Sequence, residues 1–198
     1  MNATIIKVVL LGDSGVGKTS IVQRFIYSSY KDENPPTIGA SFMSKLMTIP
    51  ENDTNIKFQI WDTAGQEKYI SLASMYYKDA QAAIIVYDIT SKKSFEAVKF
   101  WINELKTNAD PKIVIAIAGN KADLLDKEEV DLATGMKLSK SLDAVFKQTS
   151  AKENIGIEDL FLELAKKVNN SISNQKKKEG TKITEAAPNP IIKEGGCC

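Results

Sequence analysis

Short apolar runs alternate along the chain with longer segments in which apolar residues recur at helical spacing. The runs Ile5–Leu11, Ala82–Tyr87 and Ile113–Ala118 are continuous and rich in β-branched residues, as is typical of strands buried on both faces of a sheet. Ala144–Thr149 has the pattern of another strand. The intervening segments have the period of helices and cover Lys18–Ser28, Ser94–Thr107, Val130–Ser141 and Ile157–Asn169.

A different pattern occupies the region after the first predicted helix. Phe42–Ile49 and Ile56–Trp61 flank the polar segment Pro50–Asn55, which predicts an antiparallel hairpin at the edge of the sheet. Repeated strand–helix–strand units predict a doubly wound α/β fold. We expect a six-stranded, mostly parallel sheet with one antiparallel edge strand and helices on both faces. Ligands of such sheets bind at the carboxyl ends of the strands.

Composition adds the domain organisation. The chain has 198 residues, of which 43% are hydrophobic and 26% are charged, which suits one globular domain with a tail. After Asn170 the apolar period stops, and Ser, Asn, Gln, Lys, Pro and Gly dominate. We predict a domain over residues 1–170 and a disordered tail over residues 171–198. The sequence has no run long enough to span a membrane and no secretory signal, which favours an intracellular protein.

Charge and cysteine placement exclude further classes of protein. The net charge is +1, and residues 171–198 carry +2 through five lysines and three glutamates, so residues 1–170 carry −1. A nearly neutral domain argues against nucleic-acid binding, which depends on clustered basic side chains. The only cysteines, Cys197 and Cys198, are adjacent at the end of the chain and cannot cross-link a fold.

The segment Gly12–Thr19 (GDSGVGKT) directly follows a predicted strand and opens a predicted helix. In a phosphate-binding loop of this kind, glycines let backbone N–H groups surround the β-phosphate, where the helix N-terminus adds positive potential. Lys18 can reach the β- and γ-phosphate oxygens, and the Thr19 hydroxyl can ligate Mg²⁺. The alternative is a glycine-rich turn with no ligand. The residues predicted to bind the phosphates are Ser14, Gly15, Val16, Gly17, Lys18, Thr19 and Ser20.

A second candidate motif, Asp62–Gln66 (DTAGQ), ends the second strand of the predicted hairpin. A carboxylate at Asp62 suits a partner of Mg²⁺ at the end of a strand. The N–H of Gly65 can meet a γ-phosphate with no side chain in the way, and Gln66 can orient water. Alone the motif is weak, because an aspartate at the end of a strand is usually a turn former.

Two further motifs follow later strands. In Asn120–Asp123 (NKAD), an ionised Asp123 can accept from N1–H and the 2-amino group of guanine, which adenine does not offer. In Ser150–Lys152 (SAK), a backbone N–H could meet the guanine O6. Either motif alone could be an ordinary loop. Four motifs in this order, each at the carboxyl end of a predicted strand, favour a guanine nucleotide site.

The order and residues of these motifs resemble those of the Ras-like small GTPases, which implies a Ras-like P-loop GTPase fold. Trp61–Glu67 (WDTAGQE) and the terminal Gly-Gly-Cys-Cys are similar to the Rab branch. Thr37–Phe42 (TIGASF), Met75–Thr90 and Gly119–Leu124 are most similar to early-endosome Rabs. The resemblance covers roughly residues 5–168.

The resemblance implies roles for single residues. Thr37, in the segment called switch I, would ligate Mg²⁺ and sense the γ-phosphate, although Pro35-Pro36 stiffens the chain just before it. Tyr30 would stack near the guanine, and Lys121 would cover its other face. The residues expected to act in hydrolysis are Gln66, Lys18, Thr37 and Gly65, with Gln66 of switch II positioning water. The expected base contacts are Tyr30, Asn120, Lys121, Asp123, Ser150, Ala151 and Lys152, and the expected Mg²⁺ residues are Thr19, Thr37 and Asp62.

The function implied is a switch that binds GTP or GDP with Mg²⁺, hydrolyses GTP slowly and recruits effectors in the GTP state to regulate vesicle and endosomal membrane traffic. Alternatives are a Rab-like scaffold without turnover and a Rab of another compartment. An ATP-dependent kinase would lack the Asn120 and Asp123 pair. The resemblance implies a monomer with an exchange factor, an activating protein, a prenylation escort and a GDP-dissociation inhibitor as partners.

Arginine content bears on hydrolysis. An arginine at the transferring phosphate adds roughly 10³–10⁵ to the rate of such enzymes. Arg24 is the only arginine, and helix geometry puts it about two turns from the phosphates. We therefore expect an activating protein to supply an arginine in trans.

Trp61 lies on the polar face of its predicted strand. A tryptophan there is either a contact for a partner protein or is covered by a neighbouring helix. The resemblance favours the first interpretation, because Rabs display an aromatic effector patch that matches Phe42, Trp61 and Tyr76.

Cys197 and Cys198 resemble the doubly geranylgeranylated ends of Rabs. Two chains are needed because one short acyl chain gives only marginal, reversible membrane binding. The resemblance thus implies anchoring by two prenyl groups on the cytoplasmic face of endosomal or vesicle membranes, with a cytosolic pool. The alternative is an unmodified tail with two exposed thiols.

Overall fold

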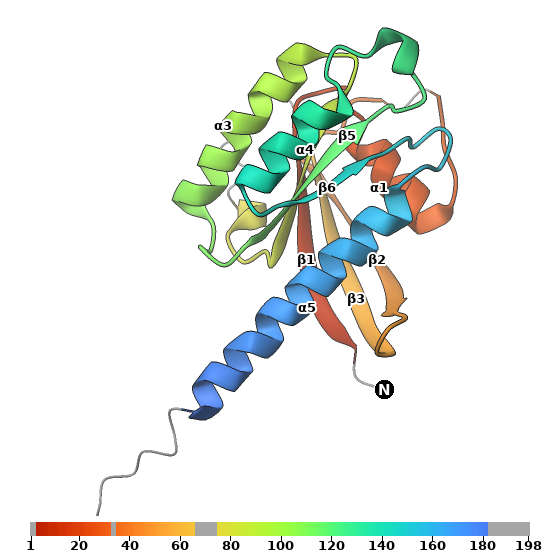
Figure 1. Cartoon of the computed structure of the whole chain (residues 1–198). Coiled ribbons are helices and arrows are strands. Elements are labelled where there is room, and N and C mark those ends of the chain that lie inside the picture. The colour runs from red at the N-terminus through yellow and green to blue at the C-terminus, as the bar shows by residue number, and fades with distance from the viewer. Residues whose placement is uncertain (1–2, 33–34, 66–74, 182–198) are drawn as a thin grey trace, which may run out of the picture. The chain divides into compact units, whose positions relative to one another are not determined.

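The computed structural model describes residues 3–32, 35–65 and 75–181, with side chains as far as Ser173. Its sheet has six strands in the order β2-β3-β1-β4-β5-β6. Only the β2–β3 pair is antiparallel, and β2 lies at the edge, which confirms the predicted fold class (Figure 1). The strands are β1 (Thr4–Leu11), β2 (Ala40–Ile49), β3 (Thr54–Thr63), β4 (Ala82–Asp88), β5 (Val114–Asn120) and β6 (Val145–Gln148).

The helices follow the predicted periodic segments closely. A short 3₁₀ turn, Leu125–Lys127, follows β5. Helix α3 begins earlier than the predicted Ser94 because the Ser91 side chain caps it by accepting from the Ser94 N–H. The α-helices are α1 (Lys18–Tyr27), α3 (Lys92–Asn108), α4 (Leu132–Ser141) and α5 (Ile157–Thr181).

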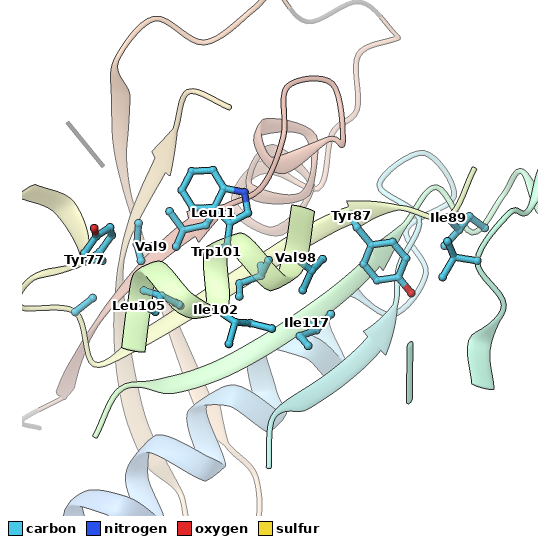
Figure 2. Packing of buried hydrophobic residues seen from close by; sticks show 14 residues of the cluster. Val9, Leu11, Tyr77, Tyr87, Ile89, Val98, Trp101, Ile102, Leu105 and Ile117 are labelled. Atoms are coloured by element: carbon cyan, nitrogen blue, oxygen red, sulfur yellow. The ribbon is translucent and has the colours of Figure 1, made fainter. Parts of the chain in front are cut away.

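Helices pack on both faces of the sheet, as predicted. On one face, α3 buries Val98, Trp101 and Leu105 against strand residues such as Val9 and Ile117 (Figure 2). On the other face, Phe25 of α1 stacks on Phe161 of α5 with ring centroids 3.7 Å apart, and Phe58 of β3 meets both rings edge-on. Each such buried ring stabilises the fold by about 1.5–3 kcal/mol. Buried apolar side chains therefore cover both faces of the sheet.

Helix α5 extends past the predicted start of the tail. The chain divides into two units, Met1–Val168 and Asn169–Cys198, close to the predicted boundary at Asn170. Helix α5, however, continues to Thr181, so residues 171–181 are helical and not disordered. The loss of apolar period was misleading, because Gln, Lys and Glu residues of this stretch favour helix without any apolar contact. The rest of the predicted tail lies outside the described residues.

Candidate guanine nucleotide site

A pocket of about 440 Å³ opens at the carboxyl edge of the sheet, where ligands of this fold class bind. It is formed by the loop after β1, the segment after α1, the end of β3, and the loops after β5 and β6. Val16, Ser150 and Asp62 do not line it directly. Predicted residues that do line it are Ser14, Gly15, Gly17, Lys18, Thr19, Ser20, Tyr30, Thr37, Gly65, Asn120, Lys121, Asp123, Ala151 and Lys152.

The predicted phosphate-binding loop has the backbone that such a loop requires. Gly17 caps α1 with φ of 95°, in the left-handed region where glycine is favoured. Gly12 is confined, because a Cβ there would come within 2.2 Å of the Val86 carbonyl oxygen. Among the described residues, no side chain caps the N-terminus of α1 and no acidic residue lies in its first turn. The helix therefore presents its free N–H groups and its positive end to an anion in the pocket.

Lys18 lies buried at the phosphate end of the pocket. Its ammonium group donates to the carbonyl oxygens of Gly12 and Asp13, at 2.7 and 2.8 Å. Burial lowers the pKa of Lys18 to about 8, and the negative charges of Asp62 and Asp13 oppose that shift. The loop thus holds a partly desolvated cation that a phosphate oxygen would stabilise.

The three residues predicted at the magnesium site are brought together from distant segments. The Thr19 hydroxyl donates to Oδ2 of Asp62 at 2.6 Å and lies 2.9 Å from the Thr37 hydroxyl. Asp62 is fully buried, and its Oδ1 has no hydrogen-bond partner among the described residues. Burial raises the pKa of Asp62, against the opposing effects of the Thr19 hydroxyl and the Lys18 charge.

This donor set fits Mg²⁺. The ion prefers hard oxygen ligands, and in nucleotide sites it takes few protein groups because phosphate and water oxygens complete its shell. The hydroxyls of Thr19 and Thr37 and the buried carboxylate of Asp62 supply such a set. The described residues contain no cluster of three or more acidic, histidine or cysteine side chains that could hold a metal without a phosphate.

Gly65 lies against the phosphate loop. A Cβ at this position would lie 2.5 Å from the Asp13 carbonyl and 2.5 Å from Nζ of Lys18. Only glycine allows the backbone after β3 to approach the phosphate loop this closely. Gln66, the next residue and the predicted water-positioning group, lies outside the described residues.

Asn120 connects the two ends of the pocket. Its amide Nδ2 donates to the Val16 carbonyl oxygen at 2.9 Å, and its Oδ1 accepts from the Thr149 hydroxyl at 3.1 Å. A Cβ on Gly17 would come within 2.3 Å of the same Nδ2. The side chain predicted to contact the base therefore fastens the phosphate loop to the loops after β5 and β6.

Asp123 and Lys121 are each held by a partner at the base end. Oδ1 of Asp123 accepts from the Ser150 hydroxyl at 2.5 Å, so Ser150 orients the carboxylate. Nζ of Lys121 pairs with Oδ2 of Asp88 at 2.6 Å. Sequence reasoning missed Asp88, although its position at the end of the buried run Ala82–Tyr87 is the signal that singled out Asp62.

Comparison with known proteins shows the family to which the chain belongs. Residues 7–170 match the Ras family. The chain is 45% identical to the Ras-related protein Rab-22A of Homo sapiens over 193 residues, covering 98% of this chain and 97% of that protein. The Rab-22A proteins of Canis lupus familiaris and Mus musculus match with the same identity and coverage. The chain belongs to the Ras family, in its Rab branch. The predicted resemblance is confirmed, and the protein is a small GTPase that regulates membrane traffic.

The three aromatic residues expected to form the effector patch of this Rab-family protein lie in contact. The ring centroids of Trp61 and Phe42 are 5.3 Å apart, and those of Trp61 and Tyr76 are 5.1 Å apart. Phe42 is 52% exposed, whereas Trp61 is half-buried and packs against the core on the α3 face. Trp61 is thus neither fully covered nor fully exposed, and its role as an effector contact stays a prediction.

The expected membrane anchor of the tail lies beyond the described part of the chain. Cys197 and Cys198, the expected prenylation sites, belong to residues 182–198. None of the helices among the described residues combines the length and apolar character that a membrane span needs.

Proposed function

We propose that this Rab-family GTPase cycles between GTP-bound and GDP-bound states with Mg²⁺ and thereby regulates traffic at endosomal membranes. The observation that carries the proposal is the junction of Thr19, Thr37 and Asp62, which joins the phosphate loop, switch I and the end of β3 at hydrogen-bond distance. A γ-phosphate and its metal can bias switch I only if these segments meet.

The chemistry divides among groups of this chain. The N-terminus of α1, Lys18 and the N–H of Gly65 hold the phosphates, and Thr19, Thr37 and Asp62 hold the metal. Bound Mg²⁺ neutralises charge on the β- and γ-phosphates. Gln66 orients the attacking water, as its place in the DTAGQ motif implies.

The rate of this reaction depends on a partner. The guanidinium of Arg24 donates to the carbonyl oxygens of Ser28, Ala151 and Lys152, so the only arginine of the chain is engaged away from the phosphates. An activating protein must therefore bring an arginine in trans. An exchange factor then resets the switch by releasing GDP.

Partners and membrane complete the proposed cycle. The exposed Phe42, with Trp61 and Tyr76, offers an aromatic surface for effectors in the GTP state. Cys197 and Cys198 carry two prenyl groups, attached with the help of an escort, and a GDP-dissociation inhibitor maintains the cytosolic pool. The GTPase domain acts as a monomer. Cys197→Ser with Cys198→Ser should leave GTP binding intact and move the protein to the soluble fraction of cells.

Bound nucleotide and single-turnover phosphate release test the proposal. The purified chain should contain GDP or GTP by chromatography and release phosphate slowly, and an activating protein should accelerate that release. Gln66→Leu should retain GTP and lower turnover tenfold or more, because no amide orients the water. Bound guanine nucleotide without any phosphate release, with or without an activating protein, would instead identify a scaffold. Undiminished release from Gln66→Leu would remove that residue from the mechanism.

A further inference from the structure

Arg24 is the only arginine of the chain, and each of its three guanidinium nitrogens donates a hydrogen bond. Nε donates to the Ala151 carbonyl oxygen, Nη2 to that of Lys152 and Nη1 to that of Ser28, each at 2.8 Å. Ala151 lies 127 positions further along the chain than Arg24. One side chain therefore joins the end of α1 to the loop after β6.

These contacts involve two segments that line the base end of the pocket. Ala151 and Lys152 line the pocket on one side, and Tyr30, two residues after Ser28, lines it as well. The Tyr30 ring centroid is 6.0 Å from Cζ of Arg24, within range of a cation–π contact. Arg24 thus touches both the loop expected to meet the guanine O6 and the aromatic expected to stack near the base.

The turn that leads into Tyr30 is held by contacts at Ser28. Ser28 ends α1 in the left-handed region with φ of 52°, and its N–H donates to the Arg24 carbonyl oxygen at 2.9 Å. The Ser28 carbonyl in turn accepts from Nη1 of the same residue. Arg24 therefore holds the turn that leads into Tyr30 through both its backbone and its side chain.

The loop after β6 is closed by its own backbone hydrogen bonds, and Arg24 connects it to α1. Ser150 and Ile155 exchange two backbone hydrogen bonds of 3.0 Å, which shape the loop between them. The Ala151 and Lys152 carbonyls point outward from this loop to the guanidinium. The planar guanidinium of arginine has fixed N–H directions and can donate to three carbonyl oxygens at once. A lysine ammonium on its flexible chain cannot reach the same three oxygens together.

We propose that Arg24 is a positioning residue for guanine nucleotide binding. It holds the Ala151–Lys152 loop and the turn before Tyr30 at a fixed separation, and thereby slows the release of nucleotide. The proposal rests on the guanine-binding function of the pocket. It assigns Arg24 to the base end, since its guanidinium donates to the carbonyl oxygens of Ser28, Ala151 and Lys152.

The test measures the release of fluorescently labelled GDP from the full-length protein into excess unlabelled GDP. Arg24→Lys keeps the charge but loses the planar guanidinium, and it should release GDP about tenfold faster than the parent. Arg24→Gln should release it at least as fast as Arg24→Lys. A parent protein that retains no GDP would contradict the proposed function itself. Equal release rates for parent and variants would contradict only the role of Arg24.

Two further arms separate positioning from general stability. Lys166→Met removes an ion pair between Lys166 and Glu51, away from the pocket, and serves as the matched control. Its melting temperature should change little, and its GDP release should equal that of the parent. The faster release of Arg24→Lys should persist in EDTA, because the base end acts independently of Mg²⁺. If the difference from the parent disappears in EDTA, Arg24 acts through switch I and the metal, and the assignment to the base end is wrong.

Discussion

The phosphate end and the base end of the pocket differ in how far apart along the chain their groups lie. Most of the phosphate end comes from one continuous segment, Gly12–Thr19, whose backbone itself forms the site. The base end is assembled from three segments, which follow α1, β5 and β6 and are held by side chains: Asn120 is bound to Val16, Ser150 to Asp123 and Arg24 to the loop after β6. The phosphate loop is therefore a local motif, whereas the metal residues and the base end depend on contacts between distant segments.

This difference predicts two kinds of mutational effect. At the phosphate end a single substitution removes a charge or donor that touches the ligand, so the loss of affinity should be large and immediate. At the base end many substitutions act through the position of a loop, so the losses should be graded. Direct contacts of Asp123 should be the exception, because we expect them to determine which base is accepted.

The largest effect should come from Lys18→Met. The variant keeps the length of the side chain but removes the buried cation, and we expect GTP and GDP affinity to fall more than a hundredfold. Lys121→Met is the matched control at the base end, where the cation is paired with Asp88, and its loss of affinity should be clearly smaller. Titration calorimetry on both variants checks the order. Equal losses would remove the proposed distinction between the two ends.

Asp123→Asn should change the base that is bound. Guanine offers two donors to the free carboxylate edge of Asp123, whereas the amide of asparagine offers a donor that suits the 2-oxo group of xanthine. We expect GTP affinity to fall about tenfold or more and xanthosine triphosphate to become the preferred nucleotide. Competition between the two nucleotides measures the change. Unaltered GTP affinity would contradict the assignment of Asp123 to the base.

Asn120→Ala tests the connection between the two ends. The substitution leaves the buried Val16 carbonyl and Thr149 hydroxyl without their partner, which should cost about 2 kcal/mol of unfolding free energy. GDP release should accelerate at the same time, because the phosphate loop loses its attachment to the base loops. Asn120→Asp retains the acceptor for Thr149 but turns a buried, unpaired carboxylate oxygen toward the Val16 carbonyl oxygen, so it should unfold at a urea concentration no higher than that of Asn120→Ala.

Sequence reasoning predicted the sheet and the four motifs, because buried strands are continuous apolar runs and each motif immediately follows one. It did not predict which groups pair behind the pocket, such as Lys121 with Asp88 or Arg24 with Ala151. Those pairs depend on the order of strands in the sheet and on loop geometry, which leave no periodic signal. The end of α5 at Thr181 was missed for a related reason, since a helix without an apolar face also lacks that signal.

The smallest expected effect is a pH dependence confined to the phosphate end. Burial lowers the pKa of Lys18 to about 8 in the free protein, so the ammonium form that binds phosphate is lost as the pH rises above that value. GDP affinity should be nearly constant from pH 6.5 to about 7.5. Above about pH 8 it should fall by up to about tenfold per pH unit.

The guanine base titrates in alkaline solution as well. Lys18→Met is therefore the control, because it retains the titration of the base and lacks that of the lysine. The parent should lose affinity between pH 7.5 and 9 more steeply than Lys18→Met in competition binding. Parallel curves would show that Lys18 stays protonated throughout this range.

Lys18 should affect the folding stability of the nucleotide-free protein in the opposite sense, because the lysine of the unfolded chain keeps its proton up to about pH 10.4. Between these two pKa values, stability should therefore rise with pH while GDP affinity falls.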